Sequence, residues 1–270
     1  MTTFHSSYAL DNDDEWADSH HALLSLLWDE STIRETLKFG SLGGKRCLEI
    51  GAGVRGRFAL WLADEVGEHG FVLATDIQPR NIPVHPSLTV MVHDLTSGVP
   101  LDGTWDYIHA RLVLAHIPQR RAIISHLANI LAPGGVLLTE DWSPQPDNMV
   151  MRAPTMRAKD LYTRFQKALT EEVFMESGVD PSWARRAHAA MVDEGLVDVR
   201  TSIHSEAWTG GEPGTELIYG TIDQLRHRLL ATGITNDELG EVKELLDDPN
   251  FVLAGHLMFS TSGRKPESGE

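Results

Sequence analysis

The sequence predicts an α/β fold with a doubly wound parallel sheet. Between residues 45 and 142, short apolar runs that end in polar residues alternate with segments of helical spacing, the pattern of parallel strands joined by helices. The first run, 46–50, is followed by a glycine-rich turn, 51–56, and then by an amphipathic helix from Arg57. A strand, a glycine loop and a helix in this order bind a nucleotide-like cofactor at the carboxyl end of a parallel sheet.

Composition and charge exclude several classes of protein. With 270 residues, the chain is long enough for one α/β domain with an added lid. Its 23 basic and 39 acidic residues give a net charge of −16, which argues against a nucleic-acid partner because a broad nucleic-acid surface needs clustered Lys and Arg. The single cysteine, Cys47, lies in the first apolar run and is expected to be a small core residue.

The sequence shows no targeting or membrane segment. The N-terminus has no basic region followed by an apolar run, so no signal peptide is expected. The apolar segments are all too short to span a bilayer. We therefore expect a cytoplasmic protein without a membrane partner.

A helical layer precedes the first strand. The segment 16–39 has helical spacing, and a second helix is expected from Thr32 to Phe39. The apolar stripe of this layer consists of Leu23, Leu24, Leu27 and Trp28. After the glycine loop, further strands are expected at 71–75, 88–92, 107–110 and 136–139.

The alternation of strands and helices stops past residue 142. The segment 148–177 is predicted to be mostly helical without a strand, and Val197–Ile203 alternates like a half-exposed strand. A last strand is expected over 251–260. The predicted parts of the chain are an N-terminal helical cap (1–44), a cofactor-binding core (45–142), a helical substrate lid and helix (143–195), the C-terminal part of the core sheet with a helical insertion (196–262) and a disordered tail (263–270).

Polar residues at the strand ends indicate a cofactor that contains ribose. Asp76 ends the second strand, where a carboxylate accepts hydrogen bonds from the two ribose hydroxyls of either NAD or S-adenosylmethionine. Three features favour S-adenosylmethionine over NAD. Glu49 stands where an NAD site usually has an apolar residue, a helical layer precedes the cofactor strand, and a Pro133-Gly134-Gly135 turn precedes the fifth strand.

Five segments carry a resemblance to a known family: CLEIGAG, VLATDI, MVHDL, WDYIHARLVLAHIP and LAPGGVLLTEDW. In this order they resemble the class I S-adenosylmethionine-dependent methyltransferases, most of all a small-molecule, natural-product group common in actinobacteria. The resemblance implies a Rossmann-like, seven-stranded, mostly parallel sheet with an antiparallel last strand, and S-adenosyl-L-methionine as cofactor. The chain departs from the family at Arg55, which stands at the place of the third loop glycine.

The resemblance also implies which residues bind the cofactor. Asp76 would hold the ribose, Ile77 would flank the adenine, and Asp94 would accept a hydrogen bond from the adenine amino group. Arg111 could pair with the ligand's carboxylate or with a carboxylate of the protein, and Asp94 could instead cap a turn. The full implied set is Glu49, Gly51, Ala52, Gly53, Asp76, Ile77, Asp94, Leu95, Ala110 and Arg111.

Methyl transfer mainly requires alignment of the acceptor with the methyl group, because the leaving group is neutral. A hydroxyl acceptor also needs a general base. His116, just after the fourth strand, is the first candidate base, although a histidine at this place more often braces the loop before the next helix. Asp141 or Glu140, at the end of the fifth strand, could orient substrate, and His109 within the fourth strand is interpreted as structural.

The histidines do not have the spacing of a known metal cage, so we expect no metal. The alternative is Mg²⁺ held by carboxylates, as in some catechol methyltransferases, and Glu140-Asp141 is the pair that would serve it.

These observations together predict S-adenosylmethionine-dependent methyl transfer to a small organic acceptor, most of all O-methylation of a secondary metabolite. One alternative is a protein of the same fold that binds the cofactor without methylating, as a cyclase or a binding module. A protein or RNA methyltransferase is another, and an NAD-dependent oxidoreductase is disfavoured by Glu49 and the Pro-Gly-Gly turn. The exposed helical layers could also form a homodimer, for which the sequence identifies no interface.

Overall fold

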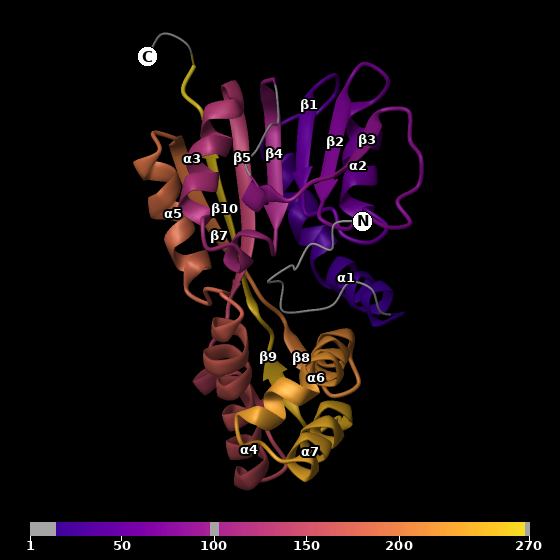
Figure 1. Cartoon of the computed structure of the whole chain (residues 1–270), viewed down its shortest axis with the longest axis vertical. Helices are drawn as coiled ribbons and strands as arrows, with labels where there is room; N and C mark the ends of the chain where they lie inside the picture. Colours follow the sequence, from indigo (N-terminus) through magenta and orange to yellow (C-terminus); the bar gives the residue numbers. More distant parts are fainter. Residues whose placement is uncertain (1–14, 98–102, 268–270) are drawn as a thin grey trace. The chain divides into compact units, whose positions relative to one another are not determined.

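The computed structural model describes residues 15–97 and 103–267 (Figure 1). Residues 1–14 of the predicted cap and 268–270 of the predicted tail therefore lie outside the described residues. The chain divides into two compact units, which we treat separately. The described parts of the sheet unit are 28–97, 103–142, 182–204 and 258–267, and those of the insert unit are 15–27, 143–181 and 205–257.

The large sheet has seven strands in the order β3-β2-β1-β4-β5-β10-β7 (Figure 1). In that order the strands are Leu88–Val92, Phe71–Asp76, Arg46–Ile50, Trp105–Arg111, Leu131–Ser143, Leu257–Arg264 and Val197–His204. The pairs β1–β2, β2–β3, β1–β4 and β4–β5 are parallel, whereas β10 and β7 are antiparallel to each other. The predicted seven-stranded, mostly parallel sheet is confirmed.

Helices cover the large sheet and bury its apolar residues. Helix α2 (Arg57–Val66) buries Phe58 and Leu62 in the same cluster as Cys47, which is fully buried as predicted. The other helices of the sheet unit are α3 (Arg120–Ile130) and α5 (Trp183–Asp193), which pack against each other.

The N-terminal helix is one continuous element, α1 (Glu15–Leu37), and the prediction of a second helix from Thr32 was wrong. Its most buried side chains are Trp28, Ser31, Thr32, Glu35 and Thr36. Four of these five are polar, and three of them, Thr32, Glu35 and Thr36, form hydrogen bonds with groups of the sheet. For example, Thr36 Oγ1 lies 2.7 Å from the Tyr107 hydroxyl.

The insert unit combines helices with a small antiparallel sheet. The sheet has the order β6-β9-β8, formed by Val150–Arg152, Val252–Ala254 and Ala207–Thr209. Its helical elements are α4 (Met156–Lys167), a π-helical segment (Ala168–Phe174), α6 (Pro213–Ala231) and α7 (Asn236–Asp247). In the core of this unit, the Phe251 ring lies 5.0 Å from that of Tyr162, which lies 5.8 Å from Phe165. These aromatic side chains are fully buried and fill the unit's own core.

Two predictions about the C-terminal half were wrong. Strand β6 lies within 148–177, where none was predicted, because three residues are too few to show an alternating pattern. The single strand predicted over 251–260 is divided into β9 and β10. Gly255 lies between them, and a Cβ at this position would be 2.6 Å from the Trp208 ring. Strand β10 also continues to Arg264, two residues into the predicted tail.

Among the described helices, none has the length and apolarity required to cross a bilayer.

The glycine turn after β1 is constrained by the loop that follows β4. Gly51 has φ of 75°, and a Cβ there would lie 2.3 Å from Val113 Cγ2. A side chain at this position would be strained by its backbone conformation and would also collide with a branched neighbour. The absence of a side chain at Gly51 therefore lets the glycine loop and the loop after β4 pack closely at the carboxyl edge of the sheet.

Replacing Gly51 by Ala should destabilise the protein by about 2–4 kcal/mol, since the positive φ and the collision both oppose the change. Gly44→Ala is the matched control, because Gly44 has φ of 74° and a methyl group added there would have no heavy atom within 4 Å. This control should cost only about 1–2 kcal/mol. Urea unfolding measures both. The double variant Gly51→Ala/Val113→Ala should recover part of the loss, and equal losses at Gly51 and Gly44 would contradict the collision.

Candidate functional site

The glycine loop is fastened to the end of β2. The amides of Gly51 and Ala52 donate to the Thr75 carbonyl at 2.8 and 3.0 Å. The Asp76 carboxylate accepts from the Gly53 amide at 2.8 Å through Oδ2 and from the Gln78 amide at 2.8 Å through Oδ1. Because a carboxylate has about four acceptor positions, Asp76 can brace the loop and still receive hydrogen bonds from a ligand.

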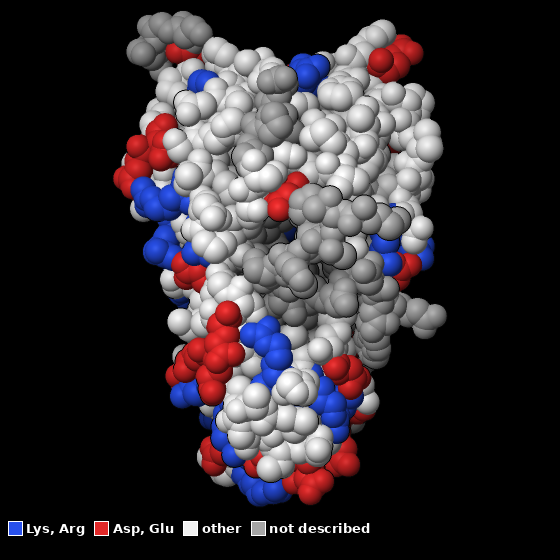
Figure 2. Space-filling model, viewed as in Figure 1, with Lys and Arg blue, Asp and Glu red and all other residues white. Residues whose placement is uncertain are grey.

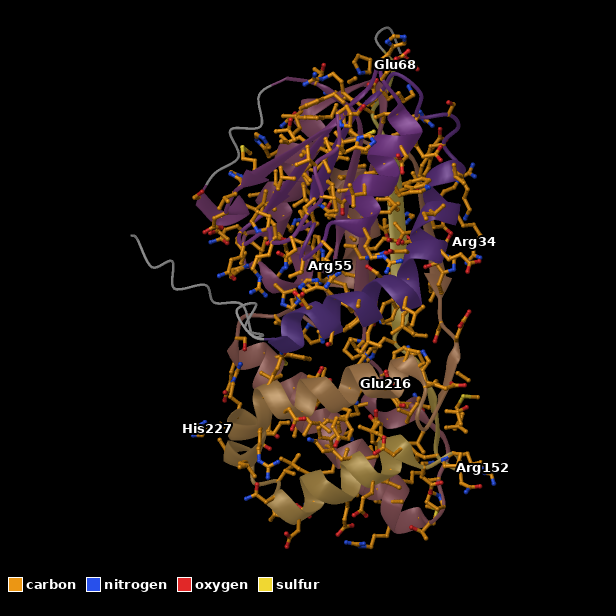
Figure 3. All side chains as sticks on the ribbon, turned by 90° about the vertical axis from the view of Figure 1, so that its right-hand side faces the viewer. Arg34, Arg55, Glu68, Arg152, Glu216 and His227 are labelled. Atoms are coloured by element: carbon orange, nitrogen blue, oxygen red, sulfur yellow. The ribbon has the colours of Figure 1, made fainter. Side chains whose placement is uncertain are left out.

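The departure at Arg55 lengthens the loop without opening it. Val54 and Arg80 form a parallel bridge, and the Arg55 amide donates to the Arg80 carbonyl at 2.8 Å. Arg55 has φ of 68°, so a non-glycine residue holds the conformation that glycine adopts readily. Its side chain is exposed (Figure 3). The backbone of 53–55 is hydrogen-bonded to Asp76 at the end of β2 and to Arg80 beyond it. Gly56, with φ of 51°, then makes the turn into α2.

The residues that the resemblance places around the adenine have unequal exposure. Ile77 is 39% exposed and offers apolar surface, whereas Leu95 is buried. Asp94 Oδ1 accepts from the Thr96 amide at 2.8 Å and from the Thr96 hydroxyl at 2.7 Å. Asp94 thus caps the short 3₁₀ turn Leu95–Ser97, the alternative role considered above. Ala110 is buried within β4, so its side chain belongs to the core.

Three side chains from adjacent strands meet at the carboxyl edge of the sheet. His109 of β4 lies between Glu49 of β1 and Glu140 of β5. Its Nδ1 is 2.6 Å from Glu49 Oε2, and its Nε2 is 3.2 Å from Glu140 Oε2. All three side chains are buried. Both ring nitrogens of His109 therefore face carboxyl oxygens in a buried site.

The charges of this trio shift the pKa values in opposite directions. Burial by itself lowers the pKa of His109, but the charge of Glu49 and the hydrogen bonds with Glu140 and Glu49 outweigh it and raise that pKa to about 9. Burial would raise the pKa of Glu140, yet the hydrogen bond with His109 and its charge hold it at about 2. At Glu49 burial prevails over His109, and the pKa is raised.

The trio is connected to α1 through hydroxyl groups and Arg111. Glu140 accepts hydrogen bonds of 2.5 Å from both Thr32 and Ser260. Arg111 donates to Thr32 Oγ1 at 2.8 Å and to Asp29 Oδ1 at 2.6 Å. Of the two partners considered for Arg111, a ligand carboxylate and a protein carboxylate, the structure shows the second.

The two catalytic candidates lie near each other and differ in basicity. Asp141 Oδ1 accepts from the Ala115 amide at 3.3 Å, and His116 is the next residue along the chain. Burial raises the pKa of Asp141 to about 7. Burial, assisted by the charge of Arg120, lowers the pKa of His116 to about 4. Asp141 is therefore better matched than His116 to accept a proton near neutral pH.

Sequence reasoning missed contacts of this site. It interpreted His109 as structural, which agrees with its complete burial, but it did not predict the contacts of His109 with Glu49 and Glu140, and it did not include Asp29 or Thr32 of α1. The signal for His109 was available, because Glu49 and His109 are register partners in parallel strands, so their side chains share a face. The contacts of α1 depend on tertiary packing and have no sequence signal. In the part of the chain that the structure describes, no cluster of His, Cys, Asp and Glu could hold a metal ion.

Comparison with known proteins identifies relatives of this chain. The family model described as "Methyltransferase domain" matches residues 21–233. A curated relative, methyltransferase str2 of Strobilurus tenacellus, is 34% identical over 99 residues, which cover 36% of this chain and 35% of the relative. Demethylmenaquinone methyltransferase of Shouchella clausii is 24% identical over 217 residues, which cover 72% and 87% of the two chains. The matched segment thus spans about a third of the length of the Strobilurus protein.

Solved structures share the fold of this chain. Phosphoethanolamine N-methyltransferase 2 of Haemonchus contortus, in complex with phosphomonomethylethanolamine and S-adenosylhomocysteine, has a TM-score of 0.54 at 16% identity, covering 89% of this chain and 53% of that one. The YcgJ protein of Bacillus subtilis has a TM-score of 0.51 at 15% identity, covering 92% and 100%. The family model covers well over half of the residues, and the chain therefore belongs to the methyltransferase-domain family.

Proposed function

We propose that this protein transfers a methyl group from S-adenosylmethionine to a small organic acceptor. The observation that carries this proposal is the glycine loop closed by Asp76 at the carboxyl edge of the sheet, where Gly53 and Gln78 each donate to one carboxylate oxygen. Similar structures contain related ligands, since the Haemonchus enzyme was solved with S-adenosylhomocysteine and also with S-adenosyl-L-methionine.

The residues of this edge fit the cofactor chemically. Asp76 retains acceptor positions for two ribose hydroxyls, and Ile77 offers exposed apolar surface beside it. Glu49 supplies an acidic group two residues before Gly51. When bound, S-adenosylmethionine supplies a methyl group on a positively charged sulfur. The task of the protein is then to bind and orient both ligands and to exclude water.

We further propose O-methylation of a secondary metabolite. Asp141 supports an oxygen acceptor, because its pKa of about 7 suits removal of a hydroxyl proton at neutral pH. The names of relatives also support an organic acceptor, since one of them specifies demethylmenaquinone rather than a macromolecule. On the face shown in Figure 2, Lys and Arg are interspersed with Asp and Glu and form no continuous basic area, which disfavours RNA as the acceptor.

Asp76→Ala should weaken S-adenosylmethionine binding by about 1–3 kcal/mol, because buried ribose hydroxyls would lose their acceptor and the loop would lose its brace. Isothermal titration calorimetry measures the change. The control is Asp64→Ala, which removes an exposed carboxylate of α2 and should leave affinity unchanged. Absence of binding to the wild-type protein at millimolar cofactor would refute the proposed cofactor.

Asp141→Asn should lower the rate of methyl transfer to a hydroxyl acceptor by about 100-fold or more, because the side chain could no longer take the proton. In the wild type the rate should be low at acid pH, where Asp141 is protonated, and should rise through about pH 7. Initial rates with isotope-labelled cofactor and a panel of phenols and carboxylic acids measure both effects.

The matched control for this change is Asp193→Asn, which alters an exposed carboxylate paired with Arg121. It should keep the wild-type rate and pH profile. A rate that is independent of pH on both sides of the Asp141 pKa of about 7 would contradict the role of Asp141. Cofactor binding without any methylated product across the panel would favour a cyclase or a binding role.

A further inference from the structure

The two carboxyl groups that flank His109 are stabilised unequally. Glu140 faces three hydrogen-bonding partners, the His109 ring at 3.2 Å and the Thr32 and Ser260 hydroxyls at 2.5 Å. Among the described residues, His109 is the single hydrogen-bonding partner of the Glu49 carboxyl group, at 2.6 Å. Glu49 is 3% exposed, so water contributes little. One buried carboxyl group is thus nearly saturated, and the other keeps most of its acceptor positions open.

The buried groups around His109 provide enough positive charge to stabilise one carboxylate rather than two. Besides Glu49 on β1 and Glu140 on β5, the titratable groups on the same face are Tyr107 and Arg111 on β4, while Asp141 of β5 acts on His109 from the opposite face of the strand. The positive charge of Arg111 is paired with Asp29 at 2.6 Å; Arg57 also lies 3.8 Å from Asp29, but its side chain is 61% exposed, so solvent screens its charge. Phe58 covers the imidazole ring at 4.6 Å, and the Tyr107 ring lies parallel to it at 6.5 Å.

Electrostatics decides which carboxyl group carries the negative charge. A buried carboxylate that lacks charge and hydrogen-bond compensation takes up a proton. Glu140, with three partners, is the group that stays ionised beside a charged His109. Glu49, with one partner and deep burial, is the group that retains a proton until another positive charge arrives. The opposite pKa shifts of the two groups agree with this assignment.

We propose that Glu49, His109 and Glu140 form a proton-linked charge site, in which Glu49 is protonated in the free protein and releases its proton to solvent when the positively charged methionine portion of the cofactor binds. His109 is the positioning residue of this site. In the free protein its ring is kept charged by the charge of Glu140 and by the hydrogen bonds with both carboxyl groups, and in the bound state the charge of Glu49 adds to them. The proton leaves the Glu49 carboxyl oxygen as the cofactor's charge takes its place, so the buried charge balance is kept. This inference rests on the proposed cofactor.

Calorimetry in buffers of different ionisation enthalpy tests the proton release. At neutral pH, the titration of wild-type protein with S-adenosylmethionine should release close to one proton more than the titration of the Glu49→Gln variant. Because the cofactor exchanges the same number of protons in both titrations, the difference between them reports the proton of Glu49. The matched control, Glu65→Gln on the exposed face of α2, should release as many protons as the wild type. The excess should vanish at a pH high enough to ionise Glu49 beforehand.

Two spectroscopic measurements test the states of the individual groups. Infrared difference spectra should show the carbonyl band of a protonated carboxyl group disappearing on cofactor binding in the wild type, and no such change in Glu49→Gln. Nitrogen-15 spectra of the wild-type protein near neutral pH should show His109 with protons on both ring nitrogens. The same two protons should be present with and without the cofactor. His109→Gln should weaken binding by about 10- to 100-fold, whereas His188→Gln, an exposed histidine, should not.

The outcomes separate this inference from the proposed function. Equal proton release by the wild type and Glu49→Gln, with both binding the cofactor, would overturn the proton-linked site and leave the methyltransferase proposal standing. A neutral His109 ring near neutral pH would overturn the site in the same way. Failure of the wild type to bind S-adenosylmethionine would overturn both. If His109→Gln does not fold, the wild-type calorimetry and spectra still decide the question.

Discussion

The contacts of His109 with Glu49 and Glu140 join three neighbouring strands at the edge of the sheet where the loops converge. Most of the hydrogen bonds around the site stabilise the buried charges of His109 and Glu140. Glu140 needs further donors, which Thr32 and Ser260 supply. Thr32 in turn lies beside Arg111 and Asp29, so the second half of α1 is held against the sheet by hydrogen bonds as well as by apolar packing.

Adjacent carboxyl groups on β5 have different properties because a strand sends successive side chains to opposite faces. Glu140 faces the imidazole ring and hydroxyl donors, which lower its pKa to about 2. Asp141 meets the Ala115 amide on the other face, and burial raises its pKa to about 7. One strand end thus provides a structural anion and a candidate base. The strand alternation keeps these roles apart although the residues are consecutive.

Most of the large sheet could be predicted, because its strands are apolar runs bounded by Gly, Pro or acidic residues and each obeys a local pattern. The order of Glu49, Gly51, Asp76 and Asp94 along the chain also indicated the kind of cofactor site. The continuity of α1 could not be predicted. Its polar residues from Thr32 onward are buried only because partners on other elements receive them. The sheet β6-β9-β8 has three-residue strands, which are too short to show a period.

By itself, the sequence determined the elements that depend on neighbours along the chain: the glycine turn and the apolar periodicity of strands and helices. The tertiary structure decided the electrostatics of the site. Whether a carboxyl group is an anion, a base or a proton carrier depends on burial and on donors that are distant in the sequence, as Thr32 and Ser260 are from Glu140. Arg111 shows the same point, because only the folded chain brings Asp29 to it. Desolvation and hydrogen bonding depend on which groups are close in space, and the order of residues along the chain does not by itself show which groups these are.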